Sequence, residues 1–270
     1  MKNNLPQQQR VIKRLKKVIT MTNNESNINE QANTRAEASQ SLSERFRRER
    51  LIISPEKMER LRKAHVALFG LGGVGSYVFE ALVRAGIGHF TITDGDTVNL
   101  TNINRQLIAL SSTVGELKTD AASRRALDIN PDVIITKNPF FYGRDNEDSI
   151  DFSKFDYVAD AIDSVSSKIL IAVKCSSQGI PLISCMGTGN KVHPELLRIA
   201  DISKTSVCPL ARVMRYELRR RGINHLPVVF STEQPLSSTD PSTIGSISFV
   251  PSVAGLLLAG KIIRDLAGIE

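Results

Sequence analysis

A polar segment in the middle of the chain, residues 94–106, carries chemical groups of the kinds that bind nucleotides. It combines carboxylates, amides and a guanidinium, among them Asp94, Asp96, Asn102, Gln106 and Arg105. An ammonium group follows thirteen residues after Arg105, at Lys118. A carboxylate can accept hydroxyls of a ribose, and two cations offset the repulsion that an anionic nucleophile meets when it attacks phosphorus. The segment therefore predicts a site that holds ATP and exposes its α-phosphate to a carboxylate, rather than a nicotinamide site.

A glycine motif precedes this segment and consists of Gly70, Gly72, Gly73 and Gly75. It lies between an expected strand, 65–69, and an expected helix, 76–85. In that context the backbone N–H groups at a helix N-terminus can bind phosphates. Asp94 comes nineteen residues after Gly75, where a ribose-binding carboxylate is expected. The motif alone fits NAD as well as ATP, and a tight turn without a ligand is the remaining alternative.

Two further carboxylates, Asp160 and Asp163, end an expected strand, 157–159. The carboxyl ends of parallel strands form the edge where such sheets bind ligands. Because Mg²⁺ is commonly held by one carboxylate together with phosphates and water, Asp163 is the predicted Mg²⁺ ligand. The alternatives are a helix cap for Asp163 and surface ion pairs for Arg105 and Lys118.

The pattern of expected elements indicates the fold. Strands are expected at 65–69, 90–93, 133–136, 157–159 and 181–184, with helices between them at 76–85, 115–129 and 166–178. This alternation predicts an α/β fold with a doubly wound, Rossmann-like, mostly parallel sheet. After Gly189 we expect a C-terminal α/β extension with strands at 196–200 and 227–230 and helices at 209–221 and 252–267. The predicted organisation is a tail, 1–40, an ATP-binding core with an N-terminal helical arm, 41–189, and a substrate-binding region packed on the same domain, 190–270.

Composition limits the function classes further. The net charge of +7 is concentrated in residues 1–50, which hold eleven Lys or Arg and five Asp or Glu. The polar tail is expected to be largely disordered, and its basic stretch, 10–19, is either a solvated segment or a contact for RNA or an acidic surface. No apolar run approaches the roughly 20 residues of a membrane helix, and the N-terminus lacks the pattern of a secretory signal. With three cysteines and no CxxC pair, we expect a cytoplasmic protein without membrane contact.

These motifs together resemble the adenylation domain shared by ubiquitin-activating enzymes and bacterial sulfur-carrier adenylyltransferases. The resemblance implies ribose binding by Asp94 and Mg²⁺ coordination by Asp163. It implies phosphate contacts from Asn102, Arg105 and Lys118. The segment 45–48 resembles the arm that reaches the other subunit of a homodimer, so that Arg48 would act in trans on the ATP phosphates. Arg47 or Arg50 could take this role instead.

The C-terminal half resembles one branch of that superfamily, the tRNA threonylcarbamoyladenosine dehydratases. The resemblance rests on residues 229–235, 208–215 and 245–250. It implies that ATP adenylates the carboxylate of threonylcarbamoyladenosine, an adenosine next to the anticodon in tRNA, after which the carbamoyl oxygen closes an oxazolone ring. It also allows a monovalent cation, Na⁺ or K⁺, and sulfur-transfer protein partners. Ring closure needs no thiol, which fits three cysteines of which only Cys208, at a helix start, is a candidate nucleophile.

A basic helix supports an RNA substrate independently of that resemblance. Three arginines share one face of the expected helix 209–221: Arg212, Arg215 and Arg219. They predict tRNA contacts, although a solvated surface helix fits equally well. The alternative functions are activation of the C-terminal Gly of a ubiquitin-like sulfur carrier, an NAD-dependent oxidoreductase, and a tRNA-binding protein without catalysis.

Overall fold

The computed structural model describes residues 44–237 and 243–269, and the chain divides into two compact units between Leu51 and Ile52. In the first unit, the described residues form a short helical turn followed by a 3₁₀ helix, Glu49–Leu51. The predictions for the tail, 1–40, and its basic stretch fall outside the described residues. All of the sheet and the helices discussed below belong to the second unit.

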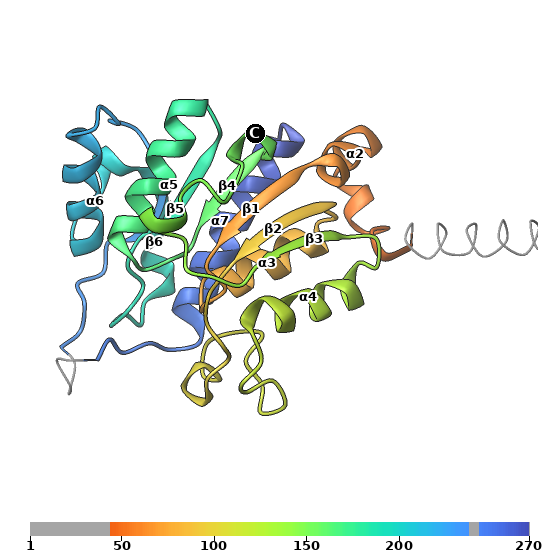
Figure 1. Ribbon diagram of the computed structural model, residues 1–270, viewed down its shortest axis with the longest axis horizontal. Helices are drawn as coiled ribbons and strands as arrows, with labels where there is room; N and C mark the ends of the chain where they lie inside the picture. The colour runs from red at the N-terminus through yellow and green to blue at the C-terminus, as the bar shows by residue number, and fades with distance from the viewer. Residues whose placement is uncertain (1–43, 238–242, 270) are drawn as a thin grey trace, which may run out of the picture. The chain divides into compact units, whose positions relative to one another are not determined.

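The second unit is built on one seven-stranded sheet with the order β3-β2-β1-β4-β5-β7-β6 (Figure 1). Its strands are β1 His65–Phe69, β2 His89–Thr93, β3 Ile134–Asn138, β4 Tyr157–Asp160, β5 Leu182–Cys185, β6 Leu197–Asp201 and β7 Pro227–Ser231. All neighbours pair in parallel except β6, which is antiparallel to β7. The predicted doubly wound, mostly parallel α/β sheet is therefore confirmed, and the C-terminal strands extend the same sheet.

The strands β1, β2, β4 and β5 are buried on both sides because helices cover both faces of the sheet. The helices are α2 Pro55–Lys63, α3 Gly75–Arg84, α4 Lys118–Ile129, α5 Val165–Gln178, α6 Pro209–Arg219 and α7 Phe249–Ala267. In β1, Val66 and Leu68 pack in one core with α2, α3, α4 and α7, whereas Ala67 and Phe69 pack in a second core with α5 and α6. This alternation follows from the two-residue period of a strand.

Helices α3 and α7 pack closely beside the glycine motif. A Cβ on Gly255 would lie 2.5 Å from the Val74 carbonyl oxygen, so only glycine allows this approach. At the start of α7, Pro251 lies 3.2 Å from the position of a Cβ on Gly73. The C-terminal helix therefore supports the turn that the sequence marks as a phosphate-binding element.

Three expected helix boundaries were wrong by a few residues. The helix predicted from Gly115 begins at Lys118, because Gly115 has a φ of +89° and belongs to a turn. The basic helix ends at Arg219, since the chain turns at Gly222 with a φ of +78°. The terminal helix begins three residues earlier than expected, at Phe249.

The sheet topology selects one edge for a ligand. The connection after β1 leads to β2 on one side, while β4 and β5 lie on the other side of β1. A crevice outside the carboxyl ends of the strands is expected at such a switch point. The polar segment after β2, olive in Figure 1, projects from this edge before α4 begins. Within the described residues, no helix is both long and apolar enough to span a bilayer.

Candidate active site

A cavity of about 550 Å³ opens at the carboxyl ends of β1, β2 and β4. Its walls include ten of the residues predicted from the sequence: Gly70, Gly72, Gly73, Asp94, Asp96, Asn102, Arg105, Gln106, Lys118 and Asp163. Segments that are up to 93 residues apart in the chain therefore meet at this edge because the parallel strands end there. The volume is in the usual range for a small-ligand site.

The glycine motif forms the turn between β1 and α3. Gly70 has a φ of +89°, a backbone conformation that glycine adopts without steric cost. Gly75 does not line the cavity but fixes the turn from behind, because a Cβ there would lie only 1.8 Å from the Gly70 carbonyl oxygen. The start of α3 is thus held against the end of β1, and the turn residues before it, Gly72 and Gly73, line the cavity, where backbone N–H groups can bind an anion.

Substitution of Gly75 by Ala is expected to abolish nucleotide binding. The added methyl group would force Gly70 and α3 apart, since the overlap is with backbone and no side chain can move to relieve it. Calorimetric titration with ATP measures the loss. Gly143→Ala is the matched control, because a Cβ on Gly143 meets nothing within 4 Å. Equal ATP affinity in Gly75→Ala and Gly143→Ala would contradict the role of the turn.

Asp94 is anchored by backbone N–H groups on both sides. Its Oδ2 accepts the Leu71 N–H at 2.6 Å, and its Oδ1 accepts the Asp96 N–H at 2.9 Å. The residue is 8% exposed. Burial raises the pKa of the Asp94 carboxyl, and the nearby Lys118 ammonium opposes that rise. Each oxygen retains a lone pair, so the carboxylate can accept ribose hydroxyls while the backbone holds it in place.

Lys118 already has anionic partners in the absence of a nucleotide. Its Nζ lies 2.7 Å from Asp96 Oδ2 and 4.0 Å from Asp94 Oδ1. The Lys118 side chain is 5% exposed, whereas the Asp96 side chain is 52% exposed. The buried ammonium is therefore fixed at the cavity wall, and its partner at 2.7 Å is a carboxylate that is half-exposed to solvent.

The loop after β2 presents the amide and guanidinium groups of the site. Asn102 closes a capping box, in which its Oδ1 accepts the Asn99 N–H at 3.0 Å. Arg105 Nη1 donates to the Thr101 carbonyl oxygen at 2.9 Å. Gln106 is 6% exposed, and its Oε1 is a buried acceptor without a hydrogen-bond partner within the described part of the chain. An unpaired buried acceptor beside the glycine motif fits a cavity that is completed by a donor on its ligand.

Asp163 lies on the turn after β4 and is exposed at the cavity wall. Among the residues that the structure describes, its carboxylate makes no hydrogen bond or ion pair, and no cluster of three or more His, Cys, Asp or Glu side chains could hold a metal ion. A metal ion at Asp163 would therefore take its other ligands from a phosphate or from water.

The turn that carries Asp163 rests on a buried polar cluster that sequence analysis missed. Lys168 Nζ lies 2.9 Å from Asp160 Oδ2 and 3.2 Å from Ser184 Oγ, which itself donates to Asp160 Oδ2 at 2.5 Å. All three residues are 0% exposed. The other Asp160 oxygen accepts the Ile162 N–H at 3.2 Å, so the cluster holds the backbone one residue before Asp163.

Aromatic side chains that line the cavity were also not predicted from the sequence. Phe140, Phe141 and Tyr142 follow β3 and line the cavity opposite the glycine motif. Phe141 is 68% exposed, and a Cβ on Gly95 would lie 2.8 Å from its ring. Flat apolar side chains of this kind suit the faces of a purine base. The run of aromatic residues in an aromatic-poor chain is the only sequence signal for this wall.

Other predicted residues lie outside this cavity. Arg48 is exposed in the first unit. Arg212 and Arg219 are exposed on α6, but Arg215 is half-buried, and its Nη1 donates to the Thr205 carbonyl oxygen at 3.0 Å and to Thr205 Oγ1 at 2.6 Å.

The three cysteines are all buried. Burial raises the pKa of the Cys175 and Cys185 thiols to about 12, so neither is a thiolate at neutral pH. Cys208 is the N-cap residue of α6 and is 4% exposed. No described cysteine combines exposure with proximity to the cavity wall.

The fold and the cavity define a nucleotide-binding α/β protein. The model of the ThiF family matches residues 46–270. A tRNA threonylcarbamoyladenosine dehydratase of Bacillus subtilis is 41% identical over 238 residues, which cover 82% of this chain and 94% of that protein. The corresponding Escherichia coli protein is 35% identical over 190 residues, with 67% of this chain and 71% of that protein covered.

Solved structures give the same assignment. The structure of the E. coli tRNA N6-threonylcarbamoyladenosine dehydratase in complex with ATP superposes with a TM-score of 0.77 at 31% identity, covering 84% of this chain and 95% of that one. The complex of that protein with AMP gives a TM-score of 0.79. The chain belongs to the ThiF family, in the branch of the tRNA threonylcarbamoyladenosine dehydratases.

Proposed function

We propose that this protein uses ATP to convert threonylcarbamoyladenosine in tRNA into its cyclic, oxazolone form. The observation that carries the proposal is the cavity at the strand ends, where a buried carboxylate, a glycine turn and two cations meet in one site. Further support comes from the B. subtilis and E. coli relatives described above, which are named for this activity and match this chain over most of their length. The protein acts as an enzyme, and ATP is consumed as a substrate.

Different residues of the cavity bind different parts of ATP. Asp94 accepts ribose hydroxyls, and the aromatic residues after β3 flank the adenine. The N–H groups of the glycine turn, together with Asn102, Arg105 and Lys118, contact the phosphates, and Gln106 Oε1 gains the donor that it lacks. This arrangement leaves the α-phosphate facing the open side of the cavity, where the carboxylate of the substrate can attack it.

Two bond exchanges complete the reaction. The substrate carboxylate oxygen bonds to the α-phosphorus as pyrophosphate leaves, giving an acyl-adenylate. The carbamoyl oxygen of the same group then bonds to the acyl carbon, AMP leaves with the former carboxylate oxygen, and the carbamoyl N–H loses its proton. Because the second step is intramolecular, holding the substrate in position supplies much of the catalysis without a thiol. The buried cysteines are consistent with this route.

Asp163 is the proposed Mg²⁺ ligand. Its carboxylate is exposed at the cavity wall beside the phosphate-binding groups, and Mg²⁺ prefers one or two carboxylates combined with phosphate oxygens and water. Bound Mg²⁺ would neutralise phosphate charge. A monovalent cation and sulfur-transfer partners remain predictions from the resemblance to the family, as does a cytoplasmic location, which the three free cysteines support.

The direct test supplies the purified protein with ATP, Mg²⁺ and tRNA that carries the open form. We expect nucleoside mass spectrometry to show the loss of one water from the modified nucleoside, with AMP and pyrophosphate released in equal amounts. Pyrophosphate exchange that depends on a ubiquitin-like carrier protein and not on tRNA would favour the carrier-activating alternative. The support for that alternative is similarity to a protein named adenylyltransferase and sulfurtransferase. Binding of NAD without ATP affinity would favour the oxidoreductase.

A homodimer with Arg48 acting in trans is also proposed. Support comes from the exposed guanidinium of Arg48 in a compact unit separate from the sheet. Mixing inactive Arg48→Ala and Lys118→Ala proteins tests it, because each mixed dimer would regain one intact site. Activity that stays absent in the mixture would argue against Arg48 in trans, and the same mixture with Arg47→Ala or Arg50→Ala examines the neighbouring arginines.

The basic helix α6 is proposed to contact tRNA. Arg212 and Arg219 are exposed and can reach phosphates directly. Arg215 lies on the same face of the helix, but its Nη1 donates hydrogen bonds to Thr205. Only the other N–H groups of its guanidinium can therefore contact RNA.

A further inference from the structure

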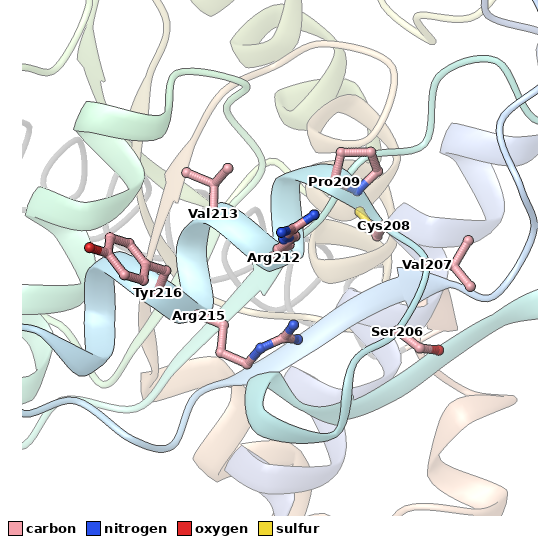
Figure 2. A pocket seen from close by; sticks show the side chains of 8 residues that line it. All are labelled: Ser206, Val207, Cys208, Pro209, Arg212, Val213, Arg215 and Tyr216. Atoms are coloured by element: carbon pink, nitrogen blue, oxygen red, sulfur yellow. The ribbon is translucent and has the colours of Figure 1, made fainter.

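A second cleft, here called the α6 cleft, lies between residues 206–208 and the first two turns of α6 (Figure 2). Its volume is about 710 Å³. The wall of the cleft is fixed from below by Arg215, which points away from Val213 in Figure 2 and ties α6 to the main chain of Thr205. The cleft is therefore shaped by hydrogen bonds that exist without any ligand.

The rim of the α6 cleft is apolar and exposed. Tyr216 is 61% exposed, Val213 is 45% exposed and Val207 is 39% exposed. Val213 and Tyr216 are three residues apart on the helix, so their side chains are neighbours. The Tyr216 ring beside Val213 offers a flat platform on which a planar group can stack, whereas Val207 lies at the other end of the cleft (Figure 2).

Positive charge surrounds this platform. The Cζ of Arg220 lies 5.6 Å from the centroid of the Tyr216 ring, and Arg212 lines the cleft one turn away. The nearest acidic side chain on α6, Glu217, is paired with Arg220 at 3.6 Å and with Arg221 at 2.6 Å. An aromatic ring among arginines is the combination that binds unpaired nucleobases next to an anionic backbone.

The α6 cleft is adjacent to the nucleotide cavity. A Cβ on Gly187 would lie 3.6 Å from Cys208 Sγ, so the chain at Gly187 packs against the residue that begins α6 and lines the cleft. The next residue, Thr188, lines the nucleotide cavity. The segment Gly187–Thr188 therefore contacts the α6 cleft on one side and the nucleotide cavity on the other, so that one RNA strand could enter both.

We propose that the α6 cleft binds an unpaired nucleobase that flanks the reacting nucleotide of the RNA substrate. The base stacks on Tyr216, and Arg212 contacts a neighbouring phosphate. This inference rests on the proposed function and adds to it a site for single-stranded RNA, distinct from phosphate contacts along the helix. It assigns recognition of loop structure to Tyr216 and general affinity for RNA to the arginines.

The test compares two RNAs on the full chain by fluorescence anisotropy over a range of KCl concentrations. One is a stem-loop with the anticodon loop of a substrate tRNA, and the other is a fully paired duplex of equal length. We expect the native protein to prefer the stem-loop. Tyr216→Ala should lower stem-loop affinity about 10-fold, leave duplex affinity unchanged and keep the salt dependence, because stacking releases no counterions. Tyr216→Phe should retain the preference.

Two further variants make the assignment specific. Arg212→Ala should weaken binding of both RNAs and reduce the salt slope by about one. Leu127→Ala, which removes another exposed apolar side chain on α4, should change neither RNA. Equal stem-loop affinity in Tyr216→Ala and the native protein overturns the inference, as does an equal loss for both RNAs. ATP affinity, measured on the same samples, should be unchanged in Tyr216→Ala. A native protein that binds ATP but neither RNA would instead overturn the proposed function.

Discussion

Replacement of Lys118 by Ala is expected to lower the rate of pyrophosphate exchange by about 10²–10³-fold, the usual loss when one fixed charge is removed from a reacting oxygen. The Lys118 side chain is 5% exposed and its Nζ is held at 2.7 Å from Asp96, so the ammonium is already positioned at the cavity wall. Steady-state kinetics with tRNA, ATP and Mg²⁺ measure the effect. Lys118→Arg should recover little, because a wider guanidinium does not fit a buried site built around a single ammonium.

Arg124→Ala is the matched control for this prediction. Arg124 lies on the same helix and pairs with Glu116 at 2.7 Å, but its side chain is 61% exposed. It should leave the rate and the melting temperature nearly unchanged. If Lys118→Ala exchanges pyrophosphate as fast as Arg124→Ala, Lys118 has no phosphate role, whatever its effect on folding.

Removal of the buried ammonium at Lys168 should produce the largest loss of stability. In Lys168→Met the Asp160 carboxylate stays buried without its cation, and breaking such a pair typically costs about 3–5 kcal/mol of unfolding free energy. Urea denaturation measures this loss. Lys174→Met on the same helix is the control, since its ion pair with Asp148 is solvent-exposed and should contribute little to stability.

A double variant separates folding from positioning. Lys168→Met with Asp160→Leu replaces the pair by apolar side chains, which often restores stability. It cannot restore the acceptor for the Ile162 N–H, so the turn that carries Asp163 should remain loose. We expect a recovered unfolding free energy together with a raised Mg²⁺ requirement for activity. If a well-folded double variant keeps the normal Mg²⁺ dependence, the cluster of Asp160, Lys168 and Ser184 stabilises the fold but does not position Asp163.

The sequence predicted the cavity well because its determinants are local. Gly70 and Asp94 follow directly after β1 and β2, Asp163 lies three residues after the end of β4, and parallel strands end at a common edge. Residue type and position along the chain therefore sufficed to bring these residues together. The sheet order and the antiparallel β6 needed the structure, since pairing between β7 and its two neighbours depends on contacts distant in sequence.

The features that the sequence did not reveal depend on tertiary contacts. Lys168 resembles an ordinary lysine on an expected helix, and only the packing of α5 on β4 buries it beside Asp160. Arg215 has the same helical spacing as Arg212, yet Thr205 on the preceding segment captures its guanidinium. The sequence pattern of a helix does not show which residue of another segment will contact it. The partners of Lys168 and Arg215 therefore could not be predicted from the sequence.

The ion pair between Lys118 and Asp96 has a consequence for selectivity among anions. Free phosphate and sulfate are abundant in cells and would be attracted to an unpaired buried ammonium. Here a small anion must displace the Asp96 carboxylate and gains little in return. In the proposed binding mode, contacts along the ribose, base and phosphates of ATP would offset the same displacement. We therefore expect phosphate and sulfate to compete weakly, and the site to select a ligand long enough to contact the whole cavity.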